Sequence, residues 1–387
     1  MIKIRGALNY TPAVILLLVA TSVLFAGLFV KERSNNYAPA QLVMEQGQTQ
    51  QQYNWRLVTT WPKNFPGLGI APERFAQMVS DMSDGRLQIE VFGAGEIVPT
   101  LGVFDAVSSG SVEMGHGGAY YWKGKIPAIP FFTSVPFGLN AQEINAWFHY
   151  GGGIELWREL YEPFNVVPYA GGNTGVQMGG WFNKEINSGD DLKGLKMRLP
   201  GIAGEVLARA GGNPVNIPGG ELYTSMQTGV IDATEWVGPY NDIAFGLHEV
   251  GRYYYYPGWH EPGSSMEFIV NRAALESLPA DLQAIVEVAT RAGNGDMLDE
   301  FTAQNSASLQ DLKSNYPEVE LRQFPQEVID YLYEQSQEYY AEESVRDPKF
   351  AEVYNSFLEF QAMTSEWLEI SESAYFEMRE NAEVEKP

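Results

Sequence analysis

Segments with the pattern of a β-strand alternate with segments with the pattern of an α-helix along most of this chain. Residues 55–60 are rich in β-branched and aromatic side chains, and residues 87–91 alternate apolar with polar ones, as strands do. Between them, residues 71–83 place apolar side chains at helical spacing. This alternation predicts α/β lobes with largely parallel sheets. A length of 387 residues suits two lobes better than one.

One helix–turn–strand unit occurs twice in the sequence. A helix predicted at 101–108 leads through Gly110 to a short strand predicted at 112–114. Residues 223–232 repeat its spacing, with an aromatic residue, then a glycine, then an apolar–acidic pair. We therefore expect the same local structure once in each lobe.

The segments that leave these two strands are rich in aromatic and polar side chains. They span residues 115–122 and 233–240. In open α/β sheets, ligands bind beyond the carboxyl ends of strands. The segments are therefore predicted to line a ligand cleft. The alternative is that their aromatic rings only pack one lobe against the other.

The N-terminus, residues 1–35, has the pattern of an export signal or membrane anchor. Lys3 and Arg5 precede an uncharged apolar run at 13–30. The run is long for a signal and slightly short for a membrane span, and a cleaved signal is favoured. Either way, the rest of the chain is expected to be exported. Residues 36–52 are polar and Gln-rich and are interpreted as a linker.

Charge and cysteine content exclude several classes of function. The formal net charge of −24 argues against nucleic acid and against an anionic membrane surface. It allows an anionic ligand, because one buried arginine can dominate the charge of a closed cleft. The chain has no cysteine, which removes disulfides, thiolate metal sites and cysteine nucleophiles.

Enzyme motifs are not found. The four histidines lack helical metal-ligand spacing, and there is no P-loop or nucleophile elbow. Gly93-Ala94-Gly95 follows a strand, but Val98 stands where a dinucleotide fingerprint requires glycine. An enzyme is therefore not predicted.

Several polar residues stand at positions that suit ligand binding. Arg198 ends a short strand just before a turn and a helix, and its guanidinium can grip a carboxylate with two hydrogen bonds. Gln177 lies in the β-like run 176–181, Glu235 follows a strand, and Glu261 lies beside a turn. Taken singly, each residue is also consistent with a structural role. Arg198 fits a surface ion pair, Gln177 fits an ordinary strand residue, and Glu235 and Glu261 fit solvated loop acids.

Three motifs together give the chain a family resemblance. Residues 197–201 read Met-Arg-Leu-Pro-Gly, residues 229–233 read Gly-Val-Ile-Asp-Ala, and the unit at 104–114 precedes them. The combination resembles the DctP-type substrate-binding proteins of TRAP (tripartite ATP-independent periplasmic) transporters over nearly the whole chain after the linker. Residues 175–182 and 235–239 are most similar to the branch that binds 2-oxo or 2-hydroxy monocarboxylates together with a metal ion.

The resemblance implies roles for individual residues. It implies that Arg198 grips the ligand carboxylate, and that Tyr120 and Tyr121 close over the ligand. The cation would be held by Gln177, Glu235, the backbone carbonyl of Trp236, and Glu261, with Gln177 and Trp236 also lining the ligand site.

The implied cation agrees with the charges. Two buried glutamates beside an anionic ligand are untenable without a positive charge. Oxygen ligands indicate Na⁺, Ca²⁺ or Mg²⁺ rather than zinc or copper. Glu235, Glu261 and one ligand carboxylate would balance a divalent ion to −1, which Arg198 would offset. The charge balance therefore favours Ca²⁺ as the bound ion and does not exclude Na⁺.

The resemblance also implies a two-lobed α/β periplasmic-binding-protein fold with crossing strands, a lobe-spanning helix and a C-terminal helical extension. The expected boundaries are mainly lobe I at 53–175, mainly lobe II with crossover strands at 176–265, a return segment with the spanning helix at 266–324, and C-terminal helices at 325–387.

The C-terminal segment is acidic and repeats apolar residues at helical spacing, with a break at Asp347-Pro348. From the residues alone, its helices could brace a lobe or pair with a second copy. The resemblance implies a homodimer.

The expected function is that of a periplasmic receptor that delivers a small organic acid, of pyruvate or lactate type, to the TRAP membrane subunits. A family receptor for a C4-dicarboxylate or sugar acid stays open, as does an enzyme or signalling module on this scaffold. A dicarboxylate would call for a second cationic group in the cleft. Pro127, Pro130, Phe131 and Phe132 are candidates either for the ligand pocket or for the core.

Overall fold

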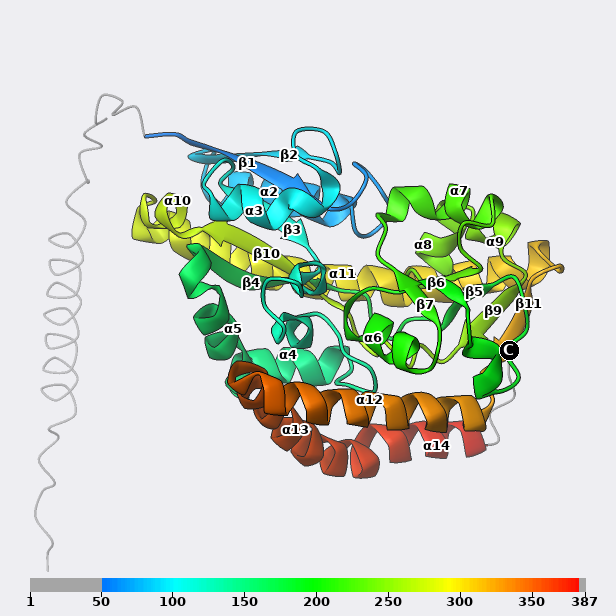
Figure 1. Ribbon diagram of the computed structural model, residues 1–387. Helices are drawn as coiled ribbons and strands as arrows, with labels where there is room; N and C mark the ends of the chain where they lie inside the picture. Colours follow the sequence, from blue (N-terminus) through cyan, green and yellow to red (C-terminus); the bar gives the residue numbers. More distant parts are fainter. Residues whose placement is uncertain (1–50, 383–387) are drawn as a thin grey trace, which may run out of the picture. The chain divides into compact units, whose positions relative to one another are not determined.

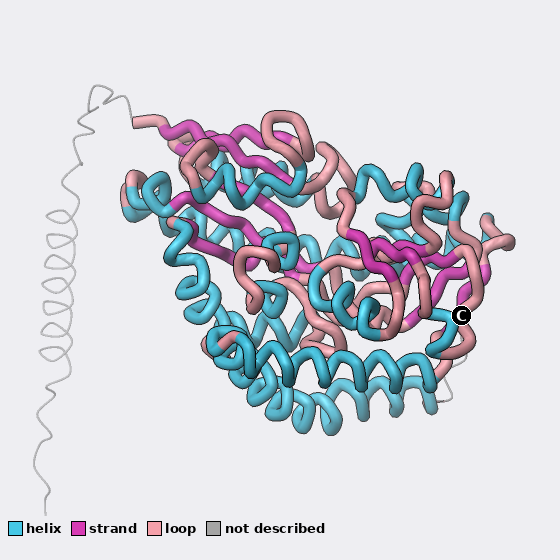
Figure 2. The backbone as a smooth tube through the Cα atoms, viewed as in Figure 1, coloured by secondary structure: helices cyan, strands magenta, loops and turns pink. Residues whose placement is uncertain are grey.

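The computed structural model of the protein describes residues 51–382, and its strands form two separate sheets (Figure 1, Figure 2). The export signal or anchor predicted at 1–35 and nearly all of the linker predicted at 36–52 lie outside the described residues. Within the described part, no helix is both long and apolar enough to cross a membrane.

The first sheet has five strands in the order β2–β1–β3–β10–β4 and is the centre of lobe I. β1 is parallel to β2 and β3, whereas β10 is antiparallel to β3 and β4. Helices cover both faces, because Leu57 and Val58 of β1 belong to two different clusters of buried side chains. The strands are β1 (Tyr53–Thr59), β2 (Leu87–Phe92), β3 (Met114–Gly117), β4 (Val166–Asn173) and β10 (Ser265–Asn271). The helices are α2 (Ile70–Met82), α3 (Val103–Ser108), α4 (Ala141–Tyr150), α5 (Gly153–Tyr161) and α10 (Arg272–Glu276).

The second sheet has six short strands in the order β11–β9–β5–β8–β6–β7 and is the centre of lobe II. The strands are β5 (Gly180–Phe182), β6 (Lys196–Arg198), β7 (Asn213–Val215), β8 (Ala233–Thr234), β9 (Tyr253–Tyr256) and β11 (Glu320–Gln323). The helices are α6 (Gly201–Arg209), α7 (Leu222–Gln227), α8 (Pro239–Ala244) and α9 (Leu247–Val250). Both sheets are mixed rather than largely parallel, because β5 and β10, the strands that follow the crossings between lobes, run antiparallel to their neighbours.

The predicted repeat is confirmed in detail. The units α3–β3 and α7–β8 each turn at a glycine in the left-handed region, Gly110 with φ of 72° and Gly229 with φ of 71°. In each unit an acidic side chain then accepts a hydrogen bond from a backbone amide of the neighbouring parallel strand. Glu113 binds an amide of β1 at 2.8 Å, and Asp232 binds an amide of β6 at 3.0 Å. The two lobes therefore use the same device to start a strand that points at the region between them.

Two strand predictions are wrong at their boundaries. β3 begins at Met114 rather than Val112, because the amides of Ser111 and Val112 still bond to Ala106 at the end of α3. In the run 176–181, only Gly180 and Trp181 belong to a strand. Gln177 N–H donates to Glu261 O and Met178 N–H donates to Val237 O, both in loops, and only Gly179 N–H already donates to a strand, at Tyr255 O of β9.

Three segments cross between the lobes. Residues 174–179 connect β4 to β5, residues 257–264 connect β9 to β10, and helix α11 (Ala280–Asn315) connects lobe I back to β11. The two loop segments are hydrogen-bonded to each other, with Gln177 N–H donating to Glu261 O at 3.2 Å and Gly258 N–H donating to Gln177 O at 3.0 Å. α11 contacts β4 and α2 of lobe I and α8 of lobe II, so the expected spanning helix is confirmed.

The C-terminal helices brace both lobes. They are α12 (Gln326–Arg346), α13 (Pro348–Leu368) and α14 (Ala374–Asn381), and Asp347 caps α13 at the predicted break. α12 packs on α6 of lobe II, whereas α13 packs on α4 and α5 of lobe I (Figure 1). Bracing, one of the two roles left open by the sequence, is therefore observed.

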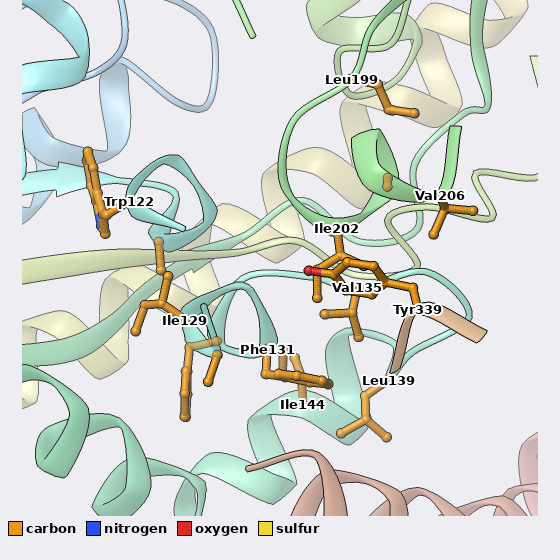
Figure 3. Close-up of a cluster of buried hydrophobic side chains, with 14 of the residues drawn as sticks. Trp122, Ile129, Phe131, Val135, Leu139, Ile144, Leu199, Ile202, Val206 and Tyr339 are labelled. Carbon is orange, nitrogen blue, oxygen red and sulfur yellow. The ribbon is translucent and has the colours of Figure 1, made fainter. Parts of the chain in front are cut away.

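The aromatic residues at 131–132 belong to the core. Phe131 and Phe132 are fully buried, and Phe131 lies in the cluster that includes Ile144 and Tyr339 (Figure 3). The ring of Phe132 stacks on Trp147 at 5.2 Å. Phe131 packs lobe I against Tyr340 and Phe357 of the C-terminal helices, whereas Phe132 packs within lobe I.

Candidate functional site

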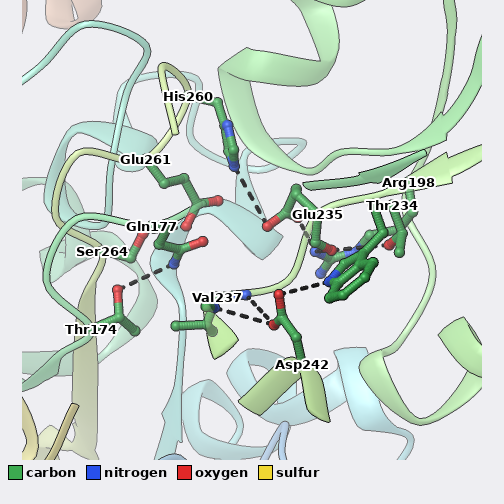
Figure 4. A network of polar contacts seen from close by, with 12 residues as sticks. Thr174, Gln177, Arg198, Thr234, Glu235, Val237, Asp242, His260, Glu261 and Ser264 are labelled. Atoms are coloured by element: carbon green, nitrogen blue, oxygen red, sulfur yellow. Dashed lines mark hydrogen bonds and ion pairs between the residues drawn. The ribbon is translucent and has the colours of Figure 1, made fainter. Parts of the chain in front are cut away.

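Arg198 is the centre of a polar cluster where the lobes meet (Figure 4). It ends β6, and its side chain is 1% exposed. One terminal nitrogen donates to the carboxylate of Glu235, and the other donates to the hydroxyl of Tyr121 at 3.2 Å. The ring of Trp236 lies 5.2 Å from its Cζ atom, close enough for a cation–π interaction. The guanidinium is therefore fixed by contacts from both lobes.

Glu235 follows β8, the strand that pairs with β6, and is as deeply buried as Arg198. Burial raises its pKa to about 7, although Arg198 acts in the opposite direction. Its Oε2 atom has no hydrogen-bond partner among residues 51–382. One carboxylate oxygen therefore faces the site without a partner from the chain.

Gln177 and Glu261 come from the two crossing segments. The amide nitrogen of Gln177 donates to Thr174 Oγ1 at 3.2 Å, which turns its Oε1 atom away from that contact, and Oε1 has no partner in the described part of the chain. Glu261 is 3% exposed and accepts a hydrogen bond from Ser264. Burial and the negative charge of Glu235 raise the pKa of Glu261 to about 7.

These donors fit a cation. Ligand atoms of Glu235, His260 and Glu261 all lie within 4.8 Å of one another. Two buried carboxylates with raised pKa values and two unpartnered oxygens, on Gln177 and Glu235, are an arrangement that a positive charge stabilises. The structure brings together Gln177, Glu235 and Glu261 from segments far apart in the sequence.

The tyrosines implied to cover the ligand lie on lobe I, in a single 3₁₀ turn, η2 (Ala119–Trp122). The ring of Tyr120 lies 4.7 Å from that of Tyr121. Both residues line a cavity of about 210 Å³ together with residues 199–201 at the start of α6. Lys123, next to the turn, forms an ion pair with Glu205 of α6. Contacts between the lobes therefore lie on both sides of Tyr121.

A buried carboxyl group holds this turn in place through a hydrogen bond from Trp122. Glu267 of β10 is fully buried and accepts hydrogen bonds from Trp122 Nε1 at 2.5 Å and from the Tyr161 hydroxyl at 2.9 Å. Burial raises the pKa of Glu267 to about 8. Trp122 is thereby held in place beside the two tyrosines.

Trp61 and His116 complete the wall on the lobe I side. The sequence did not point to Trp61, and His116 was predicted only as part of the cleft-lining segment 115–122. Trp61 packs edge-on against Trp236, with ring centroids 6.0 Å apart. Its indole N–H donates to His116 Nδ1 at 2.9 Å, while His116 Nε2 lies 3.1 Å from the carbonyl oxygen of Gly171. Burial lowers the pKa of His116 to about 4, so the ring is neutral and acts as a fixed support.

Asp242 supports the loop that carries Glu235, and it too was missed. Its Oδ1 atom accepts from the backbone amides of Val237 and Gly238, both at 3.1 Å. Its Oδ2 atom accepts from Trp181 at 2.9 Å and from Tyr254 at 2.7 Å. Four donors on one buried carboxylate fix the turn after Trp236.

His260 is the remaining unpredicted member of the cluster. Its side chain is fully buried, and its Nε2 atom lies 3.7 Å from Glu235 Oε2. Burial lowers its pKa to about 4. Adjacency to Glu261 was the only signal in the sequence, and adjacent residues usually point to different sides of a chain.

Two α/β lobes joined by crossing segments, with charged and aromatic side chains buried between them, define a solute-binding protein. Residues 57–346 match the family model DctP, described as bacterial extracellular solute-binding protein, family 7. The chain belongs to this family of TRAP solute-binding proteins.

Individual relatives share most of the chain. The monocarboxylate 2-oxoacid-binding periplasmic protein of Nostoc sp. is 44% identical over 83% of this chain and 87% of its own length. A TRAP periplasmic solute-binding protein of Pseudoalteromonas atlantica, solved with bound sodium and pyruvate, is 48% identical, with a TM-score of 0.83 over 84% of this chain and 99% of that one. A TRAP solute-binding protein of Bordetella bronchiseptica, a mixed-occupancy dimer with calcium and picolinate in one site, is 40% identical, with a TM-score of 0.83 over 85% and 97%.

Proposed function

We propose that this protein is an extracytoplasmic receptor that binds a 2-oxo or 2-hydroxy monocarboxylate, of pyruvate or lactate type, together with a metal ion. The observation that carries the proposal is the burial of Glu235 and Glu261 beside Arg198 where the two lobes meet. The receptor would deliver its ligand to the membrane subunits of a TRAP transporter.

The residues divide between the acid and the cation. Arg198 would bind the ligand carboxylate, with Tyr120, Tyr121 and Trp236 enclosing it. Gln177, Glu235, the Trp236 carbonyl and Glu261 would hold the ion, which supplies the positive charge that the two carboxylates require. A 2-oxo acid offers the ion two oxygens on adjacent carbons.

One buried cationic side chain favours a monocarboxylate. Among residues 51–382, Arg198 is the only lysine or arginine whose side chain is buried. A dicarboxylate would leave its second charge without a partner in the cleft. The names of the relatives from Nostoc and Pseudoalteromonas agree with a 2-oxo monocarboxylate.

The identity of the ion follows from charge only in part. The bound ions of the two related structures are sodium in one and calcium in the other. Both are hard cations that take carboxylate and carbonyl oxygens. We propose that either ion supports binding, with Ca²⁺ the stronger because it neutralises both glutamates.

A receptor role rather than catalysis, an exported location and a dimer are the finer parts of the proposal. Membership of a periplasmic solute-binding family supports the first two.

A second copy would pack on the C-terminal helices, where Met363, Trp367 and Ile370 are more than half exposed at helical spacing. The Bordetella relative is a dimer. Light scattering on the exported part of the chain would detect a dimer of this protein, and Trp367→Glu would disrupt that dimer.

Calorimetric titration tests the proposed function. Protein stripped with a chelator is titrated with pyruvate in the absence of added cation, and then with Na⁺ or Ca²⁺. We expect heat of binding only when a cation is present. Glu235→Gln should weaken cation and pyruvate binding together, whereas Glu185→Gln, an exposed residue of lobe II, should change neither.

Each other result has a defined meaning. Cation-independent binding would keep the role of Arg198 and dismiss the metal site. Absence of pyruvate binding under every condition, with binding of a C4-dicarboxylate or sugar acid instead, would replace the proposed ligand. Chemical conversion of pyruvate during the titration would contradict the receptor role.

A further inference from the structure

The imidazole of His260 is buried in the site with neither nitrogen hydrogen-bonded. It is 1% exposed, and both Nδ1 and Nε2 lack a hydrogen-bond partner among residues 51–382. Nε2 lies 3.7 Å from Glu235 Oε2, which is too far for a hydrogen bond. Figure 4 shows the ring pointing from its crossing segment towards Glu235.

A purely structural histidine does not explain this arrangement. Buried polar side chains nearly always use their polar atoms. His116 does so in the same protein, with Trp61 on one nitrogen and the Gly171 carbonyl on the other. The ring of His260 packs edge-on against Trp259 at 5.6 Å, a contact that a phenylalanine would make equally well. Two unused nitrogens therefore indicate a partner from outside the chain.

The surrounding charges select the kind of partner. A ring nitrogen of His260 and carboxylate oxygens of Glu235 and Glu261 lie within 4.8 Å of one another. Ligands of one metal ion, each about 2.0–2.6 Å from it, are separated by distances of this size. Before a cation is bound, an anion would be repelled by both glutamates, whereas a cation would be attracted by them.

We infer that His260 is a further ligand of the bound ion, so that the site offers nitrogen as well as oxygen donors and takes Mn²⁺ or Co²⁺ in addition to Na⁺ or Ca²⁺. This inference rests on the cation site of the proposed function. Imidazole is a poor partner for Na⁺ and Ca²⁺ but a good one for divalent transition ions, and Mn²⁺ accepts carboxylates as well. His260 would therefore decide which ions the site accepts.

Metal titrations without any organic acid test this role. Chelator-stripped wild-type protein and His260→Gln are titrated with Co²⁺, Mn²⁺ and Ca²⁺ by calorimetry, and Co²⁺ coordination is followed by visible absorption. We expect His260→Gln to lower Co²⁺ and Mn²⁺ affinity by about tenfold or more and to change the Co²⁺ spectrum. Ca²⁺ affinity should change by less than about threefold, because the glutamine offers an oxygen donor. His149→Gln, on α4 of lobe I, is the matched control.

The outcomes separate this inference from the proposed function. An unchanged Co²⁺ spectrum and affinity in His260→Gln would overturn it, as would an equal loss of all three ions. Failure of wild-type protein to bind Co²⁺ and Mn²⁺ would also overturn it, even if Ca²⁺-dependent pyruvate binding is intact. His260→Asn is measured alongside, and circular dichroism shows whether each variant is folded.

Discussion

Arg198 donates a hydrogen bond to the carboxylate of Glu235, and both side chains are 1% exposed. The group proposed to bind the acid and a group proposed to bind the ion are thus partners of each other before either arrives. Removing one of a buried pair leaves the other charge without compensation. Binding and stability are therefore linked at this pair.

Replacement of Arg198 should remove both ligand binding and stability. In Arg198→Met we expect no detectable pyruvate binding and a free energy of unfolding lower by about 3–5 kcal/mol, because Glu235 is left buried and unpaired. The double variant Arg198→Met/Glu235→Gln should regain much of the stability without regaining binding. Calorimetry and urea denaturation measure the two effects. Wild-type affinity in the single variant would refute the assignment of the ligand carboxylate to Arg198.

Asp242→Asn should weaken cation binding, although Asp242 is not one of the proposed ligands of the ion. Asparagine has one acceptor oxygen where Asp242 has two, so it cannot accept from all four donors, and at least one buried donor loses its partner, at a cost of about 1–3 kcal/mol in stability. The loop that follows Glu235 would lose its support, and we expect Ca²⁺ affinity to fall by about tenfold. Calcium titration in the presence of pyruvate measures this. Asp299→Asn, an exposed residue of α11, is the control, and equal affinities in the two variants would count against a positioning role.

The ion pair between Lys123 and Glu205 should slow the release of ligand. It joins lobe I to lobe II, and the side chains are 24% and 48% exposed. Exposed pairs contribute about 0.2–1 kcal/mol, so Glu205→Gln should raise the dissociation rate by no more than about fivefold. The effect should disappear at high salt. Stopped-flow tryptophan fluorescence measures the rate, and Asp190→Asn, which breaks a pair within lobe II, should leave it unchanged.

Glu267 should make stability depend on pH. Its pKa is raised from 4.5 to about 8 in the folded protein, so between these values the folded state holds a proton that the unfolded state has lost. The free energy of unfolding should therefore fall as pH rises through this window, by at most about 1.4 kcal/mol per pH unit. Glu267→Gln removes this contribution. Urea denaturation at the two ends of the window should show a smaller difference in the variant than in the wild type, and equal differences would contradict the prediction.

Much of the fold could be predicted because its signals are local. The spacing of glycine and acidic residues at 104–113 and 223–232 is a short-range pattern, and the structure confirms it as one unit used in both lobes. The break at Asp347-Pro348 is equally local, since Asp347 caps the helix that follows it.

The geometry of the site depends on pairings that no local pattern encodes. Arg198 meets Glu235 because β6 pairs with β8, and Gln177 meets Glu261 because two crossing loops bond to each other. The run at 176–181 has strand-like composition, yet its backbone is used by the crossing, which is why the strand there was predicted too early. His260 and Asp242 lie in no recognisable motif, so only the folded chain shows what they contact.

The two crossing segments have a mechanical consequence. Any rotation that separates the lobes must bend these segments, and they carry Gln177 and Glu261, while Glu235 moves with lobe II. Rotation of the lobes about the two crossing segments therefore changes how well Gln177, Glu235 and Glu261 fit an ion. By reciprocity, an ion that binds tightly raises the force needed to open the protein. A membrane partner that pulls the lobes apart would thus release the cation and the acid together, and neither release would need a separate signal.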